Sequence, residues 1–368
     1  MHADVIVIGA GIVGAACAHA LAAAGRQVLV LDAQRGGATG AGMGHLVVMD
    51  DNPAELALSQ HSLALWRALA PRLTADCAFS PCGTLWIAAD AAEMSAAEDK
   101  YQSLRRHGIA CRLLTAAELA SAEPALRSGL HGGLEVTGDG ILYAPNAARW
   151  LLADGGKHIA FEHAEVLAID GDAVRLADGS QRRASQTVLA NGIHATTLCP
   201  GLPIRPKKGH LLITDRYPGT VQHQLVELGY VTSAHHNEGP SVAFNLQPRP
   251  TGQLLIGSSR QFDTTDLSID ADMLAQMLQR AIAYVPGLAD INAIRSWTGL
   301  RAATPDSLPI VGPHPAREGL WLAVGHEGLG VTTATGTAAL LAALMTGATP
   351  PLDPAPYAAQ RFTEMATA

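Results

Sequence analysis

The sequence is poor in several features that mark particular classes of protein. Only 16% of its 368 residues are charged, and the net charge of −8 comes with basic residues scattered along the chain. This balance argues against nucleic acid as a partner. The five cysteines are odd in number and dispersed, and no C-x-x-C occurs. A disulfide framework or a metal cluster within this chain is therefore not expected, and the cysteine pattern fits a reducing compartment.

Signals for export or membrane insertion are also missing. The first strand is predicted to begin by residue 4, which leaves no room for a charged leader and a cleavage site. The apolar stretch 328–345 contains four threonines and three glycines, so we expect a buried helix rather than a membrane span. These patterns predict a cytoplasmic protein and leave loose peripheral association with a membrane open.

The chain does contain enough apolar material for more than one core. Hydrophobic residues make up 48% of the sequence, which is typical of a well-buried globular protein. At a length of 368 residues, two domains are expected.

The start of the chain has the pattern of a dinucleotide-binding unit. A β-branched run at 5–8 predicts a buried parallel strand, and residues 12–24 are expected to form a helix. Gly9, Gly11 and Gly14 form G-x-G-x-x-G at their junction. This motif allows a tight turn, a close approach of the backbone to a pyrophosphate, and close packing of the helix on the sheet.

A second predicted strand, 27–31, leads to an acid that completes this pattern. The carboxylate of Asp32 is placed to accept hydrogen bonds from the adenosine ribose hydroxyls. A glycine-rich packing turn is the alternative interpretation. It does not explain why strand, glycines, helix, strand and acid follow one another in this order.

The next segment, 36–44, is too rich in glycine for a helix to be expected. Its unshielded backbone N–H groups would let it lie flat against a cofactor. The alternative is a flexible surface linker, but the apolar run at 46–49 begins directly afterwards, which a linker does not need.

The middle of the chain is expected to form a second domain. Thr115 and Glu118 form a capping box that opens a short helix. Three strand-like runs suggest an antiparallel sheet; they lie at 209–214, 241–246 and 254–258.

The C-terminal part carries a second informative block. Arg301 stands in a stretch with few other charges, and a buried guanidinium needs a partner. That partner is either a substrate carboxylate bound in bidentate fashion or a structural acid such as Asp306, and the spacing leaves both open. Gly328 and Gly330 precede the apolar helix, whose N-terminal N–H groups could stabilise negative charge on a reduced ring system.

The two ends of the chain together resemble the FAD-dependent D-amino-acid oxidase/glycine oxidase superfamily. The matching elements span nearly the whole chain; they are the motif at 9–14, the glycine loop through 44, Ala190-Asn-Gly192, Gly299-Leu-Arg301 with Thr304-Pro-Asp306 and Pro309-x-x-Gly312, and Gly325-His-x-Gly328 with Gly330.

Four segments are also similar to the FAD subunit of bacterial D-hydroxyproline dehydrogenase, and more distantly to opine oxidase and hydrogen cyanide synthase subunits. These segments are 228–230, 233–235, 242–249 and 255–261. The resemblance implies a second flavoprotein subunit and an iron–sulfur subunit as electron-transfer partners. It also implies a bacterial protein of the cytoplasm or of the periphery of the inner membrane.

The resemblance implies an α/β fold with two domains. A Rossmann-type FAD-binding domain of glutathione-reductase-like topology would comprise residues 1–76, 146–203 and 296–368. An α+β substrate domain, with an antiparallel sheet covering the flavin, would comprise 77–145 and 204–295.

The same resemblance implies a set of FAD-binding residues, among which Val166 would contact adenine through its backbone. The set is Gly9, Ala10, Gly11, Ile12, Val13, Gly14, Asp32, Ala33, Thr39, Gly40, Gly42, Met43, Gly44, His45, Leu46, Val166, Ala190, Asn191, Gly192, Gly299, Arg301, His326, Glu327, Gly328, Leu329, Gly330, Val331 and Thr332.

Four residues are candidates for the substrate site. Arg301 matches the family arginine that grips the α-carboxylate. Asn245 stands where glycine oxidase-like members carry an active-site tyrosine, which implies a pocket roof lined by an amide. Tyr230 would supply the missing hydroxyl or serve as a core aromatic residue. His45 would face the flavin or substrate, or have a structural role.

The implied reaction is oxidation of a CH–NH bond, by hydride transfer from Cα of a small D-amino or imino acid to flavin N5. The hypothesis from the sequence is conversion of cis-4-hydroxy-D-proline to its cyclic imine. The alternatives are a glycine, sarcosine or D-amino-acid oxidase that uses O2, and the FAD subunit of an opine oxidase-like complex. An NAD-dependent dehydrogenase is disfavoured because the C-terminal Gly-His-x-Gly block has no role there.

Overall fold

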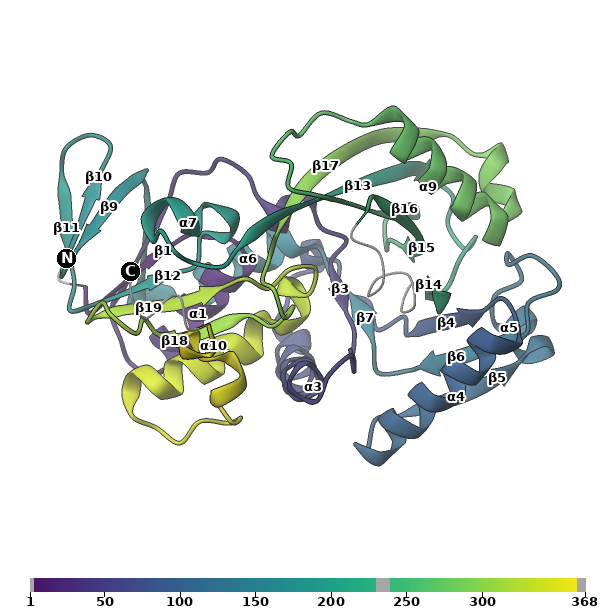
Figure 1. The fold of residues 1–368 in the computed structure, drawn as a ribbon, viewed down its shortest axis with the longest axis horizontal. Helices are drawn as coiled ribbons and strands as arrows, with labels where there is room; N and C mark the ends of the chain where they lie inside the picture. Colours follow the sequence, from purple (N-terminus) through teal and green to yellow (C-terminus); the bar gives the residue numbers. More distant parts are fainter. Residues whose placement is uncertain (1–2, 230–238, 363–368) are drawn as a thin grey trace.

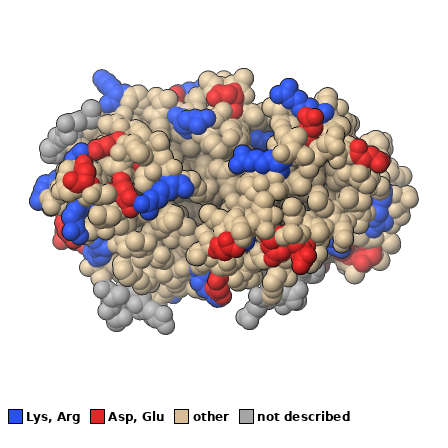
Figure 2. Space-filling view, turned by 90° about the horizontal axis from the view of Figure 1, so that it is seen from above, with Lys and Arg blue, Asp and Glu red and all other residues tan. Residues whose placement is uncertain are grey.

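The computed structural model describes residues 3–229 and 239–362 and contains two main sheets. Figure 1 shows the six-stranded sheet with its helices on the left and the eight-stranded sheet on the right. Figure 2 shows acidic and basic side chains interspersed over the face seen from above. The predicted α/β fold, with a Rossmann-type domain and a largely antiparallel second sheet, is confirmed.

The six-stranded sheet is built around β1, whose four residues are all buried because both faces are covered. The strand order is β18-β19-β12-β1-β2-β8, parallel except for β18. The strands are β1 Val5–Ile8, β2 Val28–Asp32, β8 Ile159–His163, β12 Gln186–Leu189, β18 Ile310–Pro313 and β19 Leu320–Val324.

Four helices and a small sheet complete this half of the molecule. Helix α1 packs against both α10 and α6, and α10 also packs against α3. The helices are α1 Ile12–Ala23, α3 Pro53–Leu69, α6 Ala144–Asp154 and α10 Gly330–Thr346. The small antiparallel sheet consists of β9 Val166–Asp170, β10 Ala173–Leu176 and β11 Gln181–Arg183.

The eight-stranded sheet has the order β17-β13-β16-β15-β14-β4-β6-β5. Every neighbouring pair is antiparallel except β14 and β4, which run parallel. Its strands are β4 Thr84–Ala88, β5 Cys111–Thr115, β6 Gly132–Val136, β13 Arg205–Arg216, β14 Gln224–Glu227, β15 Ser241–Pro248, β16 Gln253–Phe262 and β17 Ala293–Ala303. The antiparallel arrangement predicted for the three central runs is confirmed by the pairing of β13, β16 and β15.

Helices cover one side of this sheet, with α9 lying along β15 and β16 (Figure 1). They are α4 Ala91–Arg106, α5 Ala116–Ala122 and α9 Ala271–Tyr284. The predicted capping box is present, because the Thr115 and Glu118 side chains each accept a hydrogen bond from the other residue's backbone N–H.

Short elements join the two halves. The two-stranded sheet pairs β3 His45–Leu46 with β7 Gly140–Ile141, and the four-residue helices are α2 Ala38–Ala41 and α7 Ala195–Leu198. Single 3₁₀ turns lie at Ala70–Arg72, Ala75–Cys77, Gly156–His158, Gly192–His194, Pro286–Asp290, Ala355–Tyr357 and Ala359–Arg361.

The structure differs from the sequence expectations at two places. The expectation that 36–44 contains no helix is wrong, since α2 forms one turn there, closed by hydrogen bonds from the N–H groups of Gly40 and Ala41 to Gly37 O. A single turn needs few such bonds, and Trp297 Nε1–H also donates to Ala41 O at 3.2 Å. The second place is the domain division: the boundaries predicted at 145/146 and at 295/296 fall inside α6 and β17, so the proposed division cuts both elements.

Within the described ranges, no helix combines the length and hydropathy needed to cross a bilayer. The stretch at 328–345 instead contributes α10, most of which is buried against α1 and α3.

Candidate functional site

The turn between β1 and α1 depends on two of its glycines. Gly9 has a φ of 107°, and a Cβ at this position would lie 2.6 Å from Ala190 O. A Cβ at Gly14 would lie 1.9 Å from Gly9 O, so only glycine lets the helix start this close to the strand.

Hydrogen bonds fix the polar groups around this turn. Thr39 Oγ1 accepts from Ile12 N–H at 2.9 Å, which ties α2 to the N-terminus of α1. Asp32 accepts from Ala10 N–H at 2.6 Å through one oxygen and from Gln34 N–H at 2.5 Å through the other. The acid predicted to bind ribose is therefore held at the end of β2, beside the glycine turn.

A cavity of about 360 Å³ runs from this turn to the eight-stranded sheet. This is within the range of small-molecule sites. Of the predicted FAD-binding residues, all line the cavity except Ala10, Gly14, Gly40, Leu46, Leu329 and Thr332. Arg301, Asn245 and His45 also line it, whereas Tyr230 lies outside the described residues.

The six exceptions act around the cavity. Gly14 allows α1 to pack, and Ala10 binds Asp32 through its N–H. Leu46 belongs to the core, and Leu329 precedes the first turn of α10. Thr332 Oγ1 donates to His45 O at 2.9 Å. Gly40 forms part of the α2 turn.

The guanidinium of Arg301 lies across the face of the eight-stranded sheet. A Cβ at Gly209 on the neighbouring strand would come within 2.6 to 2.8 Å of its nitrogens and Cζ. One nitrogen, Nη1, donates to Ser259 O at 3.1 Å, on the strand beyond. Asp306, the structural partner considered above, instead forms an ion pair with Arg361 at 2.7 Å.

Two further candidates meet beside it. His45 Nε2 and Asn245 Oδ1 are 3.2 Å apart, which joins the short strand β3 to the buried strand β15. Burial lowers the pKa of His45 to about 4, the hydrogen bond to Asn245 opposes this, and Arg249 and Arg301 lower it further. His45 is therefore neutral at pH 7, and its Nε2 donates to the amide oxygen.

The Gly-His-x-Gly segment lines the cavity beside Arg301, since a Cβ at Gly328 would lie 3.9 Å from Arg301 Cδ. Burial lowers the pKa of His326 to about 3, and its Nε2 lies 3.0 Å from Thr337 Oγ1 inside the core. Burial raises the pKa of Glu327, but the ammonium of Lys207 and the charge of Arg301 outweigh it and hold that pKa below its ordinary value. The segment thus combines one buried neutral histidine and one ionised acid paired with Lys207.

Several lining residues were not among the predicted ones. Arg35 and Glu165 form an ion pair at 2.5 Å, Gly209 lies against the Arg301 guanidinium, and Ser258 also lines the cavity. Arg35 directly precedes the glycine loop and Glu165 directly precedes Val166, so adjacency to predicted positions was an available signal. Gly209 gave no signal of its own, because its role comes from the register with Gly299 across β13 and β17.

The described residues fit FAD at this site. The N-terminal residues of α1 and of α10 both line the cavity, and helix N-termini suit phosphate and anionic ring atoms. Asn191 lines it too, and its side-chain oxygen is buried without a hydrogen-bond partner among the described residues. A bound ligand would satisfy such an atom.

Known proteins resemble this chain over nearly its full length. The sequence matches the family described as FAD dependent oxidoreductase over residues 4–344. Glycine oxidase of Pseudomonas aeruginosa is 27% identical over 378 aligned residues, which cover 97% of this chain and 99% of the relative. Hydrogen cyanide synthase subunit HcnC of the same species is 27% identical over 419 aligned residues, which cover 98% and 96%. The solved structure of glycine oxidase from Geobacillus kaustophilus superposes with a TM-score of 0.86 at 27% identity, covering 97% of this chain and 98% of that one.

Proposed function

The chain belongs to the D-amino-acid oxidase family of FAD-dependent oxidoreductases, and on this basis we propose that it oxidises the carbon–nitrogen bond of a small amino or imino acid. Our candidate substrate is cis-4-hydroxy-D-proline, which would be converted to its cyclic imine. The observation that carries the proposal is the guanidinium of Arg301, held over Gly209 at the edge of the cavity. A guanidinium in this position suits bidentate binding of an α-carboxylate.

The residues of the chain supply binding and orientation. Arg301 fixes the carboxylate, which sets the direction of the Cα–H bond and of the amine lone pair. Bound FAD supplies the acceptor for the hydride that leaves Cα. Because the hydrogen would leave Cα as a hydride, no side chain has to remove a proton from Cα. His45, which is neutral and donates to Asn245, orients the amide.

The amide of Asn245 supports a hydroxylated substrate. Because its oxygen accepts from His45, its NH2 group remains as a donor on the lining of the cavity. A ring hydroxyl offers an acceptor for this group, which D-proline lacks at the same position.

A substrate screen tests the proposal. The purified yellow protein is mixed without oxygen with each epimer of hydroxyproline, D-proline, glycine, sarcosine and D-alanine, and bleaching of the flavin band is followed. We expect the fastest bleaching with cis-4-hydroxy-D-proline. Faster bleaching with D-proline would contradict the role given to Asn245.

The carboxylate assignment is tested by substitution. Arg301→Ala, with flavin content unchanged, should cost about 3 kcal/mol of transition-state binding, or about a hundredfold in kcat/KM. Arg301→Lys should recover only part of this loss, because a point charge cannot bind both oxygens. A near-normal kcat/KM in Arg301→Ala would show that another residue binds the carboxylate.

A second candidate is oxidation of glycine or sarcosine with O2. It is favoured by the identity of 27% to glycine oxidase over nearly the whole chain. Peroxide formation by the isolated chain with glycine would support it, whereas turnover that requires an artificial dye would support a dehydrogenase.

Assembly with other subunits belongs to the same proposal. One relative is named as a subunit of hydrogen cyanide synthase, which supports assembly into a multi-subunit enzyme. A second flavoprotein subunit and an iron–sulfur subunit stay a prediction. The size of the protein purified with and without the products of neighbouring genes tests this. Location in the bacterial cytoplasm stays a prediction.

A further inference from the structure

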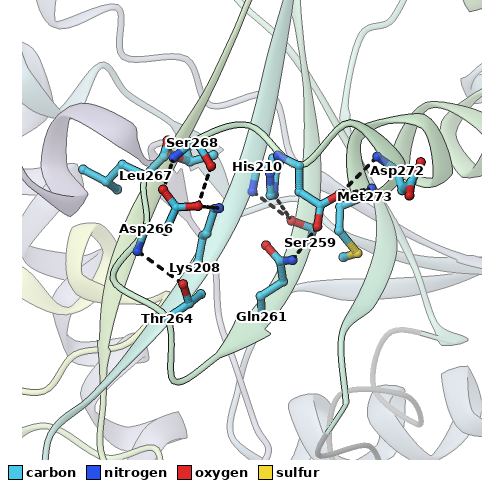
Figure 3. A network of polar contacts seen from close by, with 12 residues as sticks. Lys208, His210, Ser259, Gln261, Thr264, Asp266, Leu267, Ser268, Asp272 and Met273 are labelled. Carbon is cyan, nitrogen blue, oxygen red and sulfur yellow. Dashed lines mark hydrogen bonds and ion pairs between the residues drawn. The ribbon is translucent and has the colours of Figure 1, made fainter.

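A chain of hydrogen bonds leads from the start of α9 through His210 and Ser259 to Arg301. Figure 3 shows the contact between its central members, His210 and Ser259, and we infer that these two are positioning residues for the substrate-binding guanidinium. The inference rests on the proposed function, since it assumes that Arg301 binds the substrate carboxylate.

Arg301 ends this chain on a backbone carbonyl. Its side chain starts on the edge strand β17, passes over Gly209 on β13, and donates from Nη1 to Ser259 O on β16 at 3.1 Å. A shift of Ser259 within the sheet therefore moves the acceptor that orients the guanidinium.

The Ser259 hydroxyl holds that residue in place. It accepts from His210 N–H at 2.9 Å and lies 2.8 Å from His210 Nδ1. Both residues are almost fully buried, with exposures of 0% and 1%. A buried serine with two such contacts to one neighbour is fixed more firmly than by a strand hydrogen bond alone.

The contact made by His210 Nε2 shows whether Nδ1 donates to Ser259 Oγ or accepts from it. Asp270 N–H donates to His210 Nε2 at 3.0 Å. Nε2 is therefore an acceptor, the proton is on Nδ1, and Nδ1–H donates to Ser259 Oγ. The histidine acts as a neutral spacer between two strands and a helix start, and it does not activate the serine.

Asp270 anchors the far end. Its carboxylate caps α9 by accepting from Asp272 N–H and Met273 N–H at 3.1 Å each, and it accepts from Gln261 Nε2–H at 2.8 Å. The chain thus begins on a rigid helix terminus and on β16 itself.

The sheet contains an internal comparison for this arrangement. The pairing of β13 with β16 is irregular between Lys208 and Leu212 and again between Ile213 and Arg216. At the first irregularity Ser259 Oγ accepts from His210 N–H, and at the second Thr214 Oγ1 accepts from Leu254 N–H at 2.9 Å. Thr214 is equally buried but faces Ala293, at the opposite end of β17 from Arg301.

The experiment compares Ser259→Ala with Thr214→Val in the FAD-loaded protein. The probe is cyclopentanecarboxylate, which keeps a ring and a carboxylate but lacks the amine, and its binding is measured by the change in flavin absorbance. Thermal unfolding is measured alongside. We expect both variants to lose stability, and Ser259→Ala alone to raise the Kd of the probe, by about tenfold. An unchanged Kd in Ser259→Ala, or an equal rise in Thr214→Val, would overturn the inference.

A second pair of variants decides the matter if Ser259→Ala does not fold. His210→Asn keeps a donor near Ser259 and loses the far acceptor, whereas His210→Gln keeps an acceptor near Asp270 N–H and loses the near donor. His210→Gln should weaken binding of cyclopentanecarboxylate more than His210→Asn does. The reverse order would overturn the inference.

Arg301→Ala separates this inference from the proposed function. If Arg301→Ala leaves the Kd of cyclopentanecarboxylate unchanged, the carboxylate assignment itself is wrong. If Arg301→Ala weakens binding and Ser259→Ala does not, only the positioning role is wrong.

Discussion

At the scale of single residues, the site depends on two glycines as much as on charged side chains. Gly209 pairs with Gly299 across β13 and β17, and each lacks a Cβ at a crowded point. The space above Gly209 holds the Arg301 guanidinium, and a Cβ on Gly299 would lie 2.3 Å from the Ala41 Cβ of α2. Because neither glycine has a side chain, Arg301 and α2 can lie against neighbouring positions of the same sheet face.

Gly209→Ala is expected to displace Arg301 without unfolding the sheet. The new methyl group would fall within 2.8 Å of three guanidinium atoms, and the far end of a flexible side chain can move away. We expect a rise in KM of about tenfold or more, because the carboxylate loses a fixed partner. Gly287→Ala serves as the control for loss of a glycine, because a Cβ there meets no atom within 4 Å and the backbone has no positive φ. An unchanged KM in Gly209→Ala would show that Arg301 does not need this space.

The position of a site residue was predictable from the sequence where the type of that residue and its motif indicate its task. Asp32 was placed by its spacing after the glycine motif and Arg301 by the resemblance, and both line the cavity; their roles stay predictions. Gly209 and Ser259 were missed because their roles come from strand register, and register is fixed only when the whole sheet has formed.

At the scale of elements, the N-terminus of α10 is tied to the strand that carries His45. Thr332 Oγ1 donates to His45 O at 2.9 Å and accepts from Val47 N–H at 3.3 Å. Trp66 on α3 donates to the carbonyls of Val331 and Thr332 at 3.0 and 3.2 Å. The helix terminus that faces the cavity is thus held by two other elements.

Thr332→Val should loosen this connection. It leaves Val47 N–H buried without its acceptor, which costs about 1–3 kcal/mol of stability. We expect weaker retention of FAD, by about five- to tenfold in Kd measured by flavin fluorescence. Thr333→Val is the matched control, because the hydroxyl of Thr333 donates only within the helix, to Leu329 O. Equal FAD affinity in the two variants would contradict the role of Thr332.

The bounds of helices and strands were predictable where a local sequence pattern determines them. The capping box at Thr115 opens α5 as expected, and the strands β1 and β2 lie within one residue of their predicted bounds. Strand β17 was not predicted, because the block around Arg301 was interpreted for its chemistry and no element was assigned to it. Edge strands have a weaker hydrophobic signal, because one side of the strand has no neighbour in the sheet. Nine of the eleven residues of β17 are at least partly exposed.

At the scale of the whole molecule, buried polar groups join the two halves. Asp139, in the turn between β6 and β7, accepts from Val48 N–H at 3.0 Å, and Val48 lies three residues after His45, which lines the cavity. Asp139 is 1% exposed, and its second oxygen is buried with no hydrogen-bond partner within residues 3–229 and 239–362. Burial raises the pKa of Asp139 to about 7, against the opposing effects of its hydrogen bonds and of Lys100 and Arg67.

This connection makes the stability of the protein depend on pH in a defined direction. Between pH 4 and 7 the folded protein keeps a proton on Asp139 that the unfolded chain has lost, so the contribution of this residue to stability falls as the pH rises through that window. Asp139→Asn does not titrate and keeps an acceptor for Val48 N–H. The free energy of unfolding of the variant relative to the wild type should therefore increase by up to about 1.4 kcal/mol per pH unit from pH 4 to 7, and then level off.

Urea unfolding of both FAD-loaded proteins at pH 5 and pH 8 measures this difference. Asp290→Asn, at an exposed position, controls for the loss of one negative charge. The amide oxygen introduced by Asp139→Asn would still accept the hydrogen bond from Val48 N–H and so keep the backbone near the cavity in place. We therefore expect Asp139→Asn to leave the KM of the substrate unchanged at pH 8. A difference in unfolding free energy that is the same at both pH values would show that Asp139 is ionised in the folded protein, and that the two halves are joined there by a charge.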